Sequence, residues 1–386
     1  MQTRSLDPAD VGRAYDIRSR AFGPLAPDAR PGWEAIAHKA IDERRTIGVY
    51  DDSLLVGRAM IWPFQQYWGG RAVAMAGVAG VVVSPEYRGR GVGGALMDGV
   101  IERGRELGFP VSALYPATVP VYRRRGWEMA GVQARYTIQT GLLRELRGGS
   151  VAVREAGPAD AQTMQDLMTT VYAAGRLNGP RGFPASELTD DLEDHGVFAY
   201  LADDGFVVYG WDGKELVVYQ LVARSSETAR ALWAVVGSGS SVSPQVHAYL
   251  APDDPLHQLL GECVVEQVRQ TRWMLRVLDL SAAVAGRGFA LGVDLDVPIA
   301  VRDAQVPANC LTGRLRVAGG SGELVADGST GADAVRLTAN GIAALYAGTS
   351  MASLTTAGVA SGGSAEDHAR LDAAFVGRPA YLLDYF

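Results

Sequence analysis

The chain has 386 residues, of which 48% are hydrophobic and 20% are charged. This composition excludes a disordered or fibrous protein, and the length exceeds the roughly 250–300 residues at which single cores stop growing, so two or three domains are expected. The net charge is −7, from 36 basic and 43 acidic residues, which argues against a nucleic-acid-binding surface and leaves room for a cationic substrate.

Targeting segments, cysteines and histidines add few constraints. The N-terminus lacks the apolar core of a signal peptide, and no run of about 18 apolar residues occurs, so no export and no membrane span are expected and the cytoplasm is the default location. Cys263 and Cys310 lie far apart, outside any ligand spacing, and are expected to be buried small apolar residues. The five histidines share no ligand spacing either, so no metal is expected.

The first 140 residues predict strands and helices in the order β-α-α-β-β-β-α-β-α-β. Residues 3–6 alternate like a short strand, and a proline-containing turn at 8–10 then opens a helix whose apolar face comprises Val11, Ala14, Ile17 and Phe22. A second helix follows Pro31. The later elements are two strands within 46–62 joined at Asp51, a strand at 71–85, a helix over 91–108 ended by Gly108, a strand at 111–116, a short helix at 119–126 and a strand at 127–139.

Around residue 150 the pattern restarts. Pro158-Ala159-Asp160 repeats Pro8-Ala9-Asp10 at an offset of 150 residues, again between a strand and a helix, which predicts an internal duplication. From about 287 the chain changes to glycine-punctuated alternating segments that predict antiparallel strands mixed with short helices. We therefore expect domains at 1–145, 150–285 and 287–386. The last residues, Tyr-Leu-Leu-Asp-Tyr-Phe, are too apolar for a frayed end and are expected to be docked.

The stretch RGRGVG, residues 88–93, follows a strand and opens a helix. Glycines let a backbone approach a ligand closely, and the free amides and dipole of a helix N-terminus favour an anion such as a pyrophosphate. Arg88 and Arg90 add permanently charged donors. A tight turn with solvated arginines is the alternative. The dinucleotide fingerprint is excluded because the loop follows the fourth strand and no acidic residue ends the next one, and a Walker loop is excluded because no Gly-Lys-Ser/Thr follows. The second copy has Ala-Arg-Ser-Ser-Glu at 223–227 in place of this loop and is not expected to bind the same ligand.

With this element order, the Arg-x-x-Gly-x-Gly loop and a Tyr-x-x-x-Gly-Trp segment at Tyr122, Gly126 and Trp127, the first 140 residues resemble the Gcn5-related N-acetyltransferases. The resemblance implies an α/β fold with mixed sheets and acetyl-coenzyme A (acetyl-CoA) as cosubstrate. The pyrophosphate would bind the loop at Arg88, Gly89, Arg90, Gly91, Gly93 and Gly94. The pantetheine would pair with the main chain around Val81, Val82 and Val83.

The whole chain is similar to the enhanced intracellular survival (Eis) acetyltransferases, which implies tandem acetyltransferase domains, the second degenerate, and a third domain like the sterol carrier proteins. The resemblance implies Tyr122 as general acid, the carboxylate of the C-terminal residue, Phe386, as general base, an aminoglycoside-like amine as acceptor, and a homohexamer. The acceptor pocket has no fixed motif. Its candidate residues, by neighbourhood only, are Phe22, Asp28, Trp33 and Asp384.

The chemistry fits these residues and leaves alternatives. A carboxylate can collect the proton of an ammonium group, a backbone amide near Val81–Val83 can stabilise an oxyanion, and a tyrosine protonated at neutral pH can protonate a thiolate. Tyr115 competes with Tyr122 for the last role. Tyr122 could also be a packing residue and Phe386 a hydrophobic anchor. The alternative functions are acetylation of protein lysines or N-termini, and non-catalytic binding of a lipid or coenzyme A.

Overall fold

A computed structural model of the chain describes residues 1–261, 265–327 and 333–386. Cys263 lies outside these residues. The elements of the first 145 residues follow the predicted order: β1 (Gln2–Arg4), α1 (Val11–Phe22), α2 (Arg30–Asp42), β2 (Thr46–Asp51), β3 (Leu54–Trp68), β4 (Arg71–Val83), α3 (Val92–Glu106), β5 (Val111–Leu114), α4 (Val119–Arg123), β6 (Glu128–Gln139) and α5 (Thr140–Glu145). Gly108, with φ +79°, follows the end of α3 as predicted.

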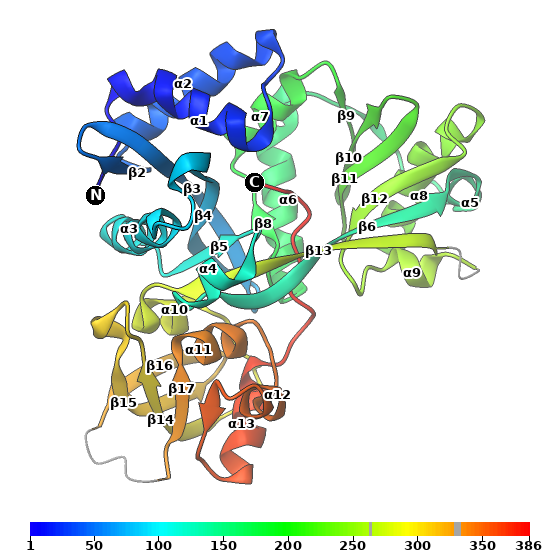
Figure 1. Cartoon of the computed structure of the whole chain (residues 1–386). Coiled ribbons are helices and arrows are strands. Elements are labelled where there is room, and N and C mark those ends of the chain that lie inside the picture. The colour runs from blue at the N-terminus through cyan, green and yellow to red at the C-terminus, as the bar shows by residue number, and fades with distance from the viewer. Residues whose placement is uncertain (262–264, 328–332) are drawn as a thin grey trace.

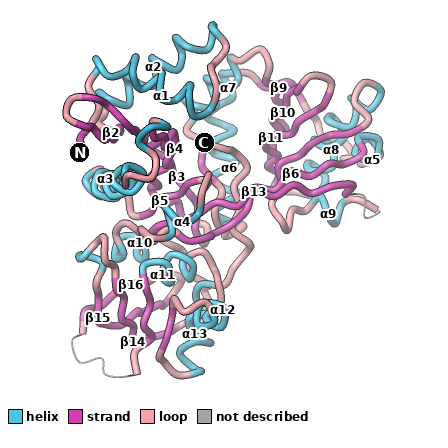
Figure 2. Tube along the Cα trace, viewed as in Figure 1, coloured by secondary structure: helices cyan, strands magenta, loops and turns pink. Residues whose placement is uncertain are grey.

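Helices cover both faces of this part of the sheet (Figure 2). α1 and α2 pack on one face and α3 on the other, each against its own group of buried aliphatic side chains. The inward face of α1 ends before Phe22, which is 58% exposed, so its assignment to that face was wrong. Phe22 lies five residues after Ile17, a step that turns it about 140° away from the buried stripe.

The second stretch repeats the arrangement: β7 (Arg154–Ala156), α6 (Ala161–Ala174), β8 (Arg181–Gly182), α7 (Ala185–Glu193), β9 (Val197–Ala202), β10 (Gly205–Asp212), β11 (Glu215–Ala223), α8 (Ser226–Gly237), β12 (Gln245–Leu250), α9 (Leu256–Leu259), β13 (Val265–Val277) and α10 (Leu280–Gly286). A 3-10 turn, Pro158–Asp160, precedes α6 as Pro8–Asp10 precedes α1, and each is closed by a carboxylate bonded to the backbone amide before the turn.

The two repeats share one sheet. Within the described residues its strands run β1-β2-β3-β4-β5-β13-β6-β12-β11-β10-β9-β7, with β8 beside β3. β13 therefore lies between β5 and β6, and β6 in turn pairs with β12 of the second repeat. The two halves spread apart at this junction (Figure 1). The domain limits expected from the sequence thus cut a continuous sheet.

The third part has its own sheet of β14 (Leu295–Arg302), β15 (Leu311–Ala318), β16 (Ser321–Ala326), β17 (Val335–Thr338) and β18 (Ala360–Ser361), in the order β16-β15-β14-β17-β18. Its helices are α11 (Ala339–Tyr346), α12 (Met351–Thr356) and α13 (Ala365–Phe375). Cys310 is exposed, contrary to expectation. It precedes β15, whose inward positions are 313, 315 and 317, so Cys310 falls on the outward alternation.

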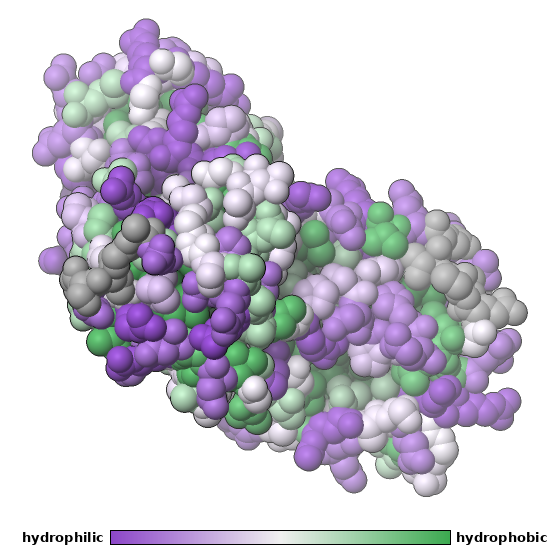
Figure 3. All heavy atoms as spheres, turned by 90° about the horizontal axis from the view of Figure 1, so that it is seen from below, coloured by the Kyte–Doolittle hydropathy of each residue, from purple (hydrophilic) through white to green (hydrophobic). Residues whose placement is uncertain are grey.

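The last residues return from the third domain to the junction of the two halves, where the C-terminus lies near α6 and β8 (Figure 1). Backbone hydrogen bonds join Leu382 N to Val132 O at 3.1 Å and Val132 N to Ala380 O at 3.3 Å, which confirms the docked tail. Seen from below, the surface is largely hydrophilic, with hydrophobic residues in small separate areas (Figure 3). Among the described residues, no helix is both long and apolar enough to cross a bilayer.

Candidate active site

The glycine loop forms a backbone cradle at the start of α3. Gly89 and Gly91 have φ values of +76° and +83°, which favour glycine, and a Cβ at either position would meet no atom within 4 Å. The first amides of a helix have no intrahelical acceptor, and no side chain caps the start of α3. These amides can therefore bind a ligand. Arg88 and Arg90 are exposed and form no ion pair within the described part of the chain. These features fit a pyrophosphate.

Arg125 borders the cradle. A Cβ at Gly94 would lie 2.4 Å from an Arg125 terminal nitrogen, so the guanidinium occupies the space that a larger residue would need. Asp98 holds Arg125 through bonds of 2.7 and 2.9 Å, while the neighbouring Arg123 pairs with Glu128. Of these two arginines, only Arg125 is placed beside the loop.

The second repeat shows how the cradle is lost. At the corresponding strand-to-helix turn, Ser225 caps α8 by accepting a hydrogen bond from Thr228 N at 3.2 Å. The Thr228 hydroxyl in turn contacts Asp204. One of the amides that would face an anion is thus bonded within the chain, and a carboxylate lies next to the turn, which disfavours a second anion. The second copy is therefore built without the cradle of the first.

Strands β4 and β5 separate beside this loop. They pair in parallel only over Met75–Gly77, and within the described residues no strand pairs with that edge of β4 from Val78 to Val83. Gly80 has φ +58°, and the register between β3 and β4 shifts next to it. Val82 points into the core, whereas Val81 and Val83 are half-buried. The free main-chain edge can pair with an extended chain such as pantetheine.

Tyr122 lies on α4 and is 5% exposed. Burial raises the pKa of its hydroxyl above the ordinary value of 10, and nearby Tyr385 adds to the shift. Among the described residues, its hydroxyl has no hydrogen-bond partner. Tyr122 is therefore a protonated, unengaged donor at neutral pH.

Tyr115 differs, because its hydroxyl donates to Asp384 O at 2.8 Å. Burial, together with the Asp384 carboxyl, raises the pKa of Tyr115 well above its ordinary value. Its ring stacks on Tyr385 with centroids 4.3 Å apart. The structure thus gives Tyr115 a part in holding the tail.

Phe386 lies where β4 and β5 begin to separate. Its ring contacts Phe64 and Tyr115 at centroid distances of 5.1 and 5.5 Å, and a Cβ at Gly77 would lie 3.2 Å from it. Gln133 donates to Leu383 O at 3.0 Å, which fixes the chain just before the last residues. The C-terminal residue therefore lies beside the free edge of β4.

An acidic cavity of about 390 Å³ opens beside the tail, between α7 and the face of β9–β11. Its carboxylates are Glu187, Asp191 and Asp384. Burial raises the pKa of Asp191, and Glu187 adds to the shift. Burial also raises the pKa of Asp384, against the opposing effect of Arg181, and the Asp384 Oδ1 has no hydrogen-bond partner. A cationic group bound here would favour the charged form of these carboxyls, two of which are already paired with Arg181.

Of the candidate acceptor residues, only Asp384 lines this cavity. Phe22 and Asp28 are exposed, and Trp33 is half-buried, with its ring under the Arg58 guanidinium. Three further lining residues, Glu187, Asp191 and Arg181, belong to the second repeat and were not predicted from the sequence. Arg181 is buried and binds Asp384 at 2.6 Å and Glu187 at 2.8 Å. No local motif marks these residues, because only the fold brings them to the tail. Within the described residues, no group of three or more His, Cys, Asp or Glu is arranged to hold a metal.

Comparisons with known proteins agree with this geometry. The acetyltransferase (GNAT) domain family matches residues 2–130 and again, through a second family of the same description, residues 184–277, and the sterol carrier protein domain family matches residues 280–383. The crystal structure of a GCN5-related N-acetyltransferase from Kribbella flavida is 48% identical, covers 100% of this chain and 98% of that chain, and superposes with a TM-score of 0.98.

Two further relatives are named as N-acetyltransferases. An uncharacterized N-acetyltransferase of Streptomyces griseus is 28% identical, over 78% of this chain and 80% of that protein. The N-acetyltransferase Eis of Mycobacterium tuberculosis is 27% identical, over 69% of this chain and 71% of that protein. The chain therefore belongs to the GCN5-related N-acetyltransferase family, is itself an N-acetyltransferase of two such domains and a sterol-carrier-like domain, and has the Eis proteins among its relatives.

Proposed function

We propose that the chain transfers an acetyl group from acetyl-CoA directly to an amine of a small polycationic acceptor, such as an aminoglycoside, in a ternary complex. The observation that supports this acceptor is the cavity that contains Glu187, Asp191 and Asp384 and that Tyr385 also lines. Tyr385 also stacks on Tyr115 and adds to the raised pKa of Tyr122, so one residue of the cavity lies near the proposed general acid.

Acetyl-CoA supplies the activated acetyl group. The backbone of Gly89, Gly91, Gly93 and Gly94, with Arg88 and Arg90, would hold the pyrophosphate. The free edge of β4 at Val81–Val83 would hold the pantetheine, and one of its amides would stabilise the carbonyl oxygen as it becomes negative. These assignments rest on the cradle and on the separation of β4 from β5.

Three proton transfers complete the reaction. The C-terminal carboxylate of Phe386 accepts a proton from the acceptor ammonium, and the free amine attacks the thioester carbon. The new N–C bond forms as the C–S bond breaks, Tyr122 protonates the leaving sulfur, and the second proton of the attacking nitrogen passes to the resulting tyrosinate, which restores Tyr122. A carboxylate is a weak base, so Phe386 serves mainly to attract and orient the cation.

Other predictions from the sequence stand beside this one. Protein lysines or N-termini are the alternative acceptors, and Phe22, Asp28 and Trp33 stay candidates for the outer part of the acceptor site. The lipid-binding alternative has less support, because the apolar segments of the third domain pack into one core together with Trp68 and Trp273 of the first sheet. A cytoplasmic location and a hexamer remain predictions.

The experiment measures acetyl-CoA turnover on a panel of aminoglycosides and polyamines for the native chain and for a chain extended by a few residues past Phe386. We expect turnover to be lost and coenzyme binding to be retained in the extended chain. The matched control carries the same residues before Met1, which is exposed. Equal turnover in all three chains would remove Phe386 as the base. No turnover on any amine, with turnover on a peptide panel, would favour the protein acceptor.

A further inference from the structure

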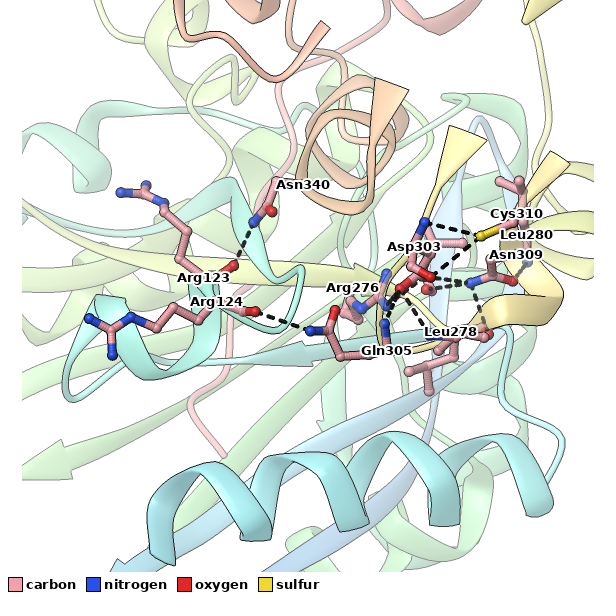
Figure 4. A network of polar contacts seen from close by, with 12 residues as sticks. Arg123, Arg124, Arg276, Leu278, Leu280, Asp303, Gln305, Asn309, Cys310 and Asn340 are labelled. Atoms are coloured by element: carbon pink, nitrogen blue, oxygen red, sulfur yellow. Dashed lines mark hydrogen bonds and ion pairs between the residues drawn. The ribbon is translucent and has the colours of Figure 1, made fainter. Parts of the chain in front are cut away.

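The helix that carries Tyr122 is held at its C-terminal end by the third domain. α4 has only five residues, and such a short helix has little stability of its own. The Asn340 side-chain amide, from the first turn of α11, donates to Arg123 O at 2.9 Å and to Trp127 O at 3.0 Å (Figure 4 shows the first of these). One side chain thus bridges both ends of the turn that follows α4.

The turn itself is shaped for this contact. Gly126 has φ +84°, and a Cβ there would lie 2.8 Å from Ala339 Cβ and 2.8 Å from Arg276 Nε. Any other residue would force α11 away from α4. The glycine that the sequence pattern singled out before Trp127 therefore allows the third domain to approach.

A buried ion pair anchors the same contact. Arg276 on β13 binds both carboxylate oxygens of Asp303 at 2.6 Å, and the two side chains are 0% and 1% exposed. Asp303 also accepts a hydrogen bond from the backbone amide of Gln305 at 3.1 Å. The Gln305 side-chain amide donates to Arg124 O at 3.4 Å. Figure 4 shows these residues as one network running from β13 to the end of α4. The third domain is thus tied to the sheet next to β5 and to α4 at once.

We propose that Asn340 is a positioning residue for Tyr122, and that the third domain serves the reaction by fixing α4. The Tyr122 hydroxyl has no hydrogen bond of its own within the described chain, so its position depends on the packing of its ring and on the backbone of α4. Small displacements of a reacting group cost large factors in rate. This inference rests on the proposed role of Tyr122 as general acid.

The first test is a double-mutant cycle of Asn340→Ala and Tyr122→Phe. We expect Asn340→Ala to lower kcat by about tenfold, with the KM for acetyl-CoA within about twofold of the native value. In the Tyr122→Phe background the same change is expected to cost nothing further. Arg71→Ala is the matched control, because it removes another contact with the third domain, the 2.8 Å bond to Ser321, away from α4. It should leave kcat unchanged.

The second test does not depend on turnover. Asn340→Ala should speed hydrogen exchange of the Arg124, Arg125, Gly126 and Trp127 amides, which bond within the turn, while Arg71→Ala should not. Equal kcat losses in both backgrounds, or unchanged exchange, would overturn the proposal. If Tyr122→Phe alone has full activity, Tyr122 is not the general acid. The hydrogen-exchange result then still decides whether Asn340 holds the turn after α4 in place. If Asn340→Ala does not fold, Asn340→Ser replaces it.

Discussion

Tyr122 and Tyr115 are close in sequence, but their surroundings decide which of them has an available proton. The Tyr115 hydroxyl donates a hydrogen bond to Asp384 O, whereas the Tyr122 hydroxyl has no hydrogen-bond partner in the described structure. The Arg-x-x-Gly-x-Gly loop and Tyr122 could be proposed as site residues from the sequence because each belongs to a local motif. Arg181 could not, since its role depends on Asp384, a residue 203 positions later in the chain.

Replacement of Tyr122 by phenylalanine should lower kcat by about 10²-fold or more, because general acid catalysis contributes on that order. The raised pKa of Tyr122 favours its protonated hydroxyl. This active form is fully populated at low pH and is lost only as pH rises through a value above 10. The kcat of the native chain should therefore show no loss from Tyr122 up to about pH 9.5. A fall in kcat with an apparent pKa below about 9, absent from Tyr122→Phe, would contradict this.

At the scale of elements, the order of strands and helices followed from periodicity and turn residues, and the start of α3 at a left-handed glycine followed from the loop. The pairing of β13 with β5 and β6 did not. An alternating pattern shows which residues of a strand face a core, but it does not name the neighbouring strand. The expected domain limits of 150–285 therefore placed β13 wholly within the second repeat.

The glycine cradle gives a test with a built-in comparison. Gly91→Ala places a Cβ on a left-handed residue, which costs about 1–2 kcal/mol of stability, and should also weaken acetyl-CoA binding by about tenfold or more. Gly213→Ala adds a Cβ at φ +62° in similarly open space, in the β10–β11 turn. Both variants should melt at lower temperature, but only Gly91→Ala should lose affinity in a calorimetric titration with coenzyme A. Equal affinities would remove the loop from the coenzyme site.

At the scale of the molecule, the parts of the proposed site come from all three regions of the chain. The cradle and Tyr122 belong to the first region, and the acidic cavity lies on the second. The third region supplies the tail and Asn340, which holds the end of α4. β13 and the tail both cross the junction of the two halves. Because these strands pair over long distances in the sequence, a fragment of the chain leaves some of its strand edges without a partner.

We therefore expect residues 1–146, expressed alone, to be insoluble or loosely packed. Without β13 the strand β5 has an open edge, and β6, whose partners are β12 and β13, has no partner at all. Exposed edges of this kind promote aggregation. Co-expression with residues 147–386 should restore a soluble one-to-one complex that binds acetyl-CoA, because the missing strand is then supplied in trans. If residues 1–146 alone unfold in one cooperative transition and bind acetyl-CoA, strand β13 is not required for the first domain.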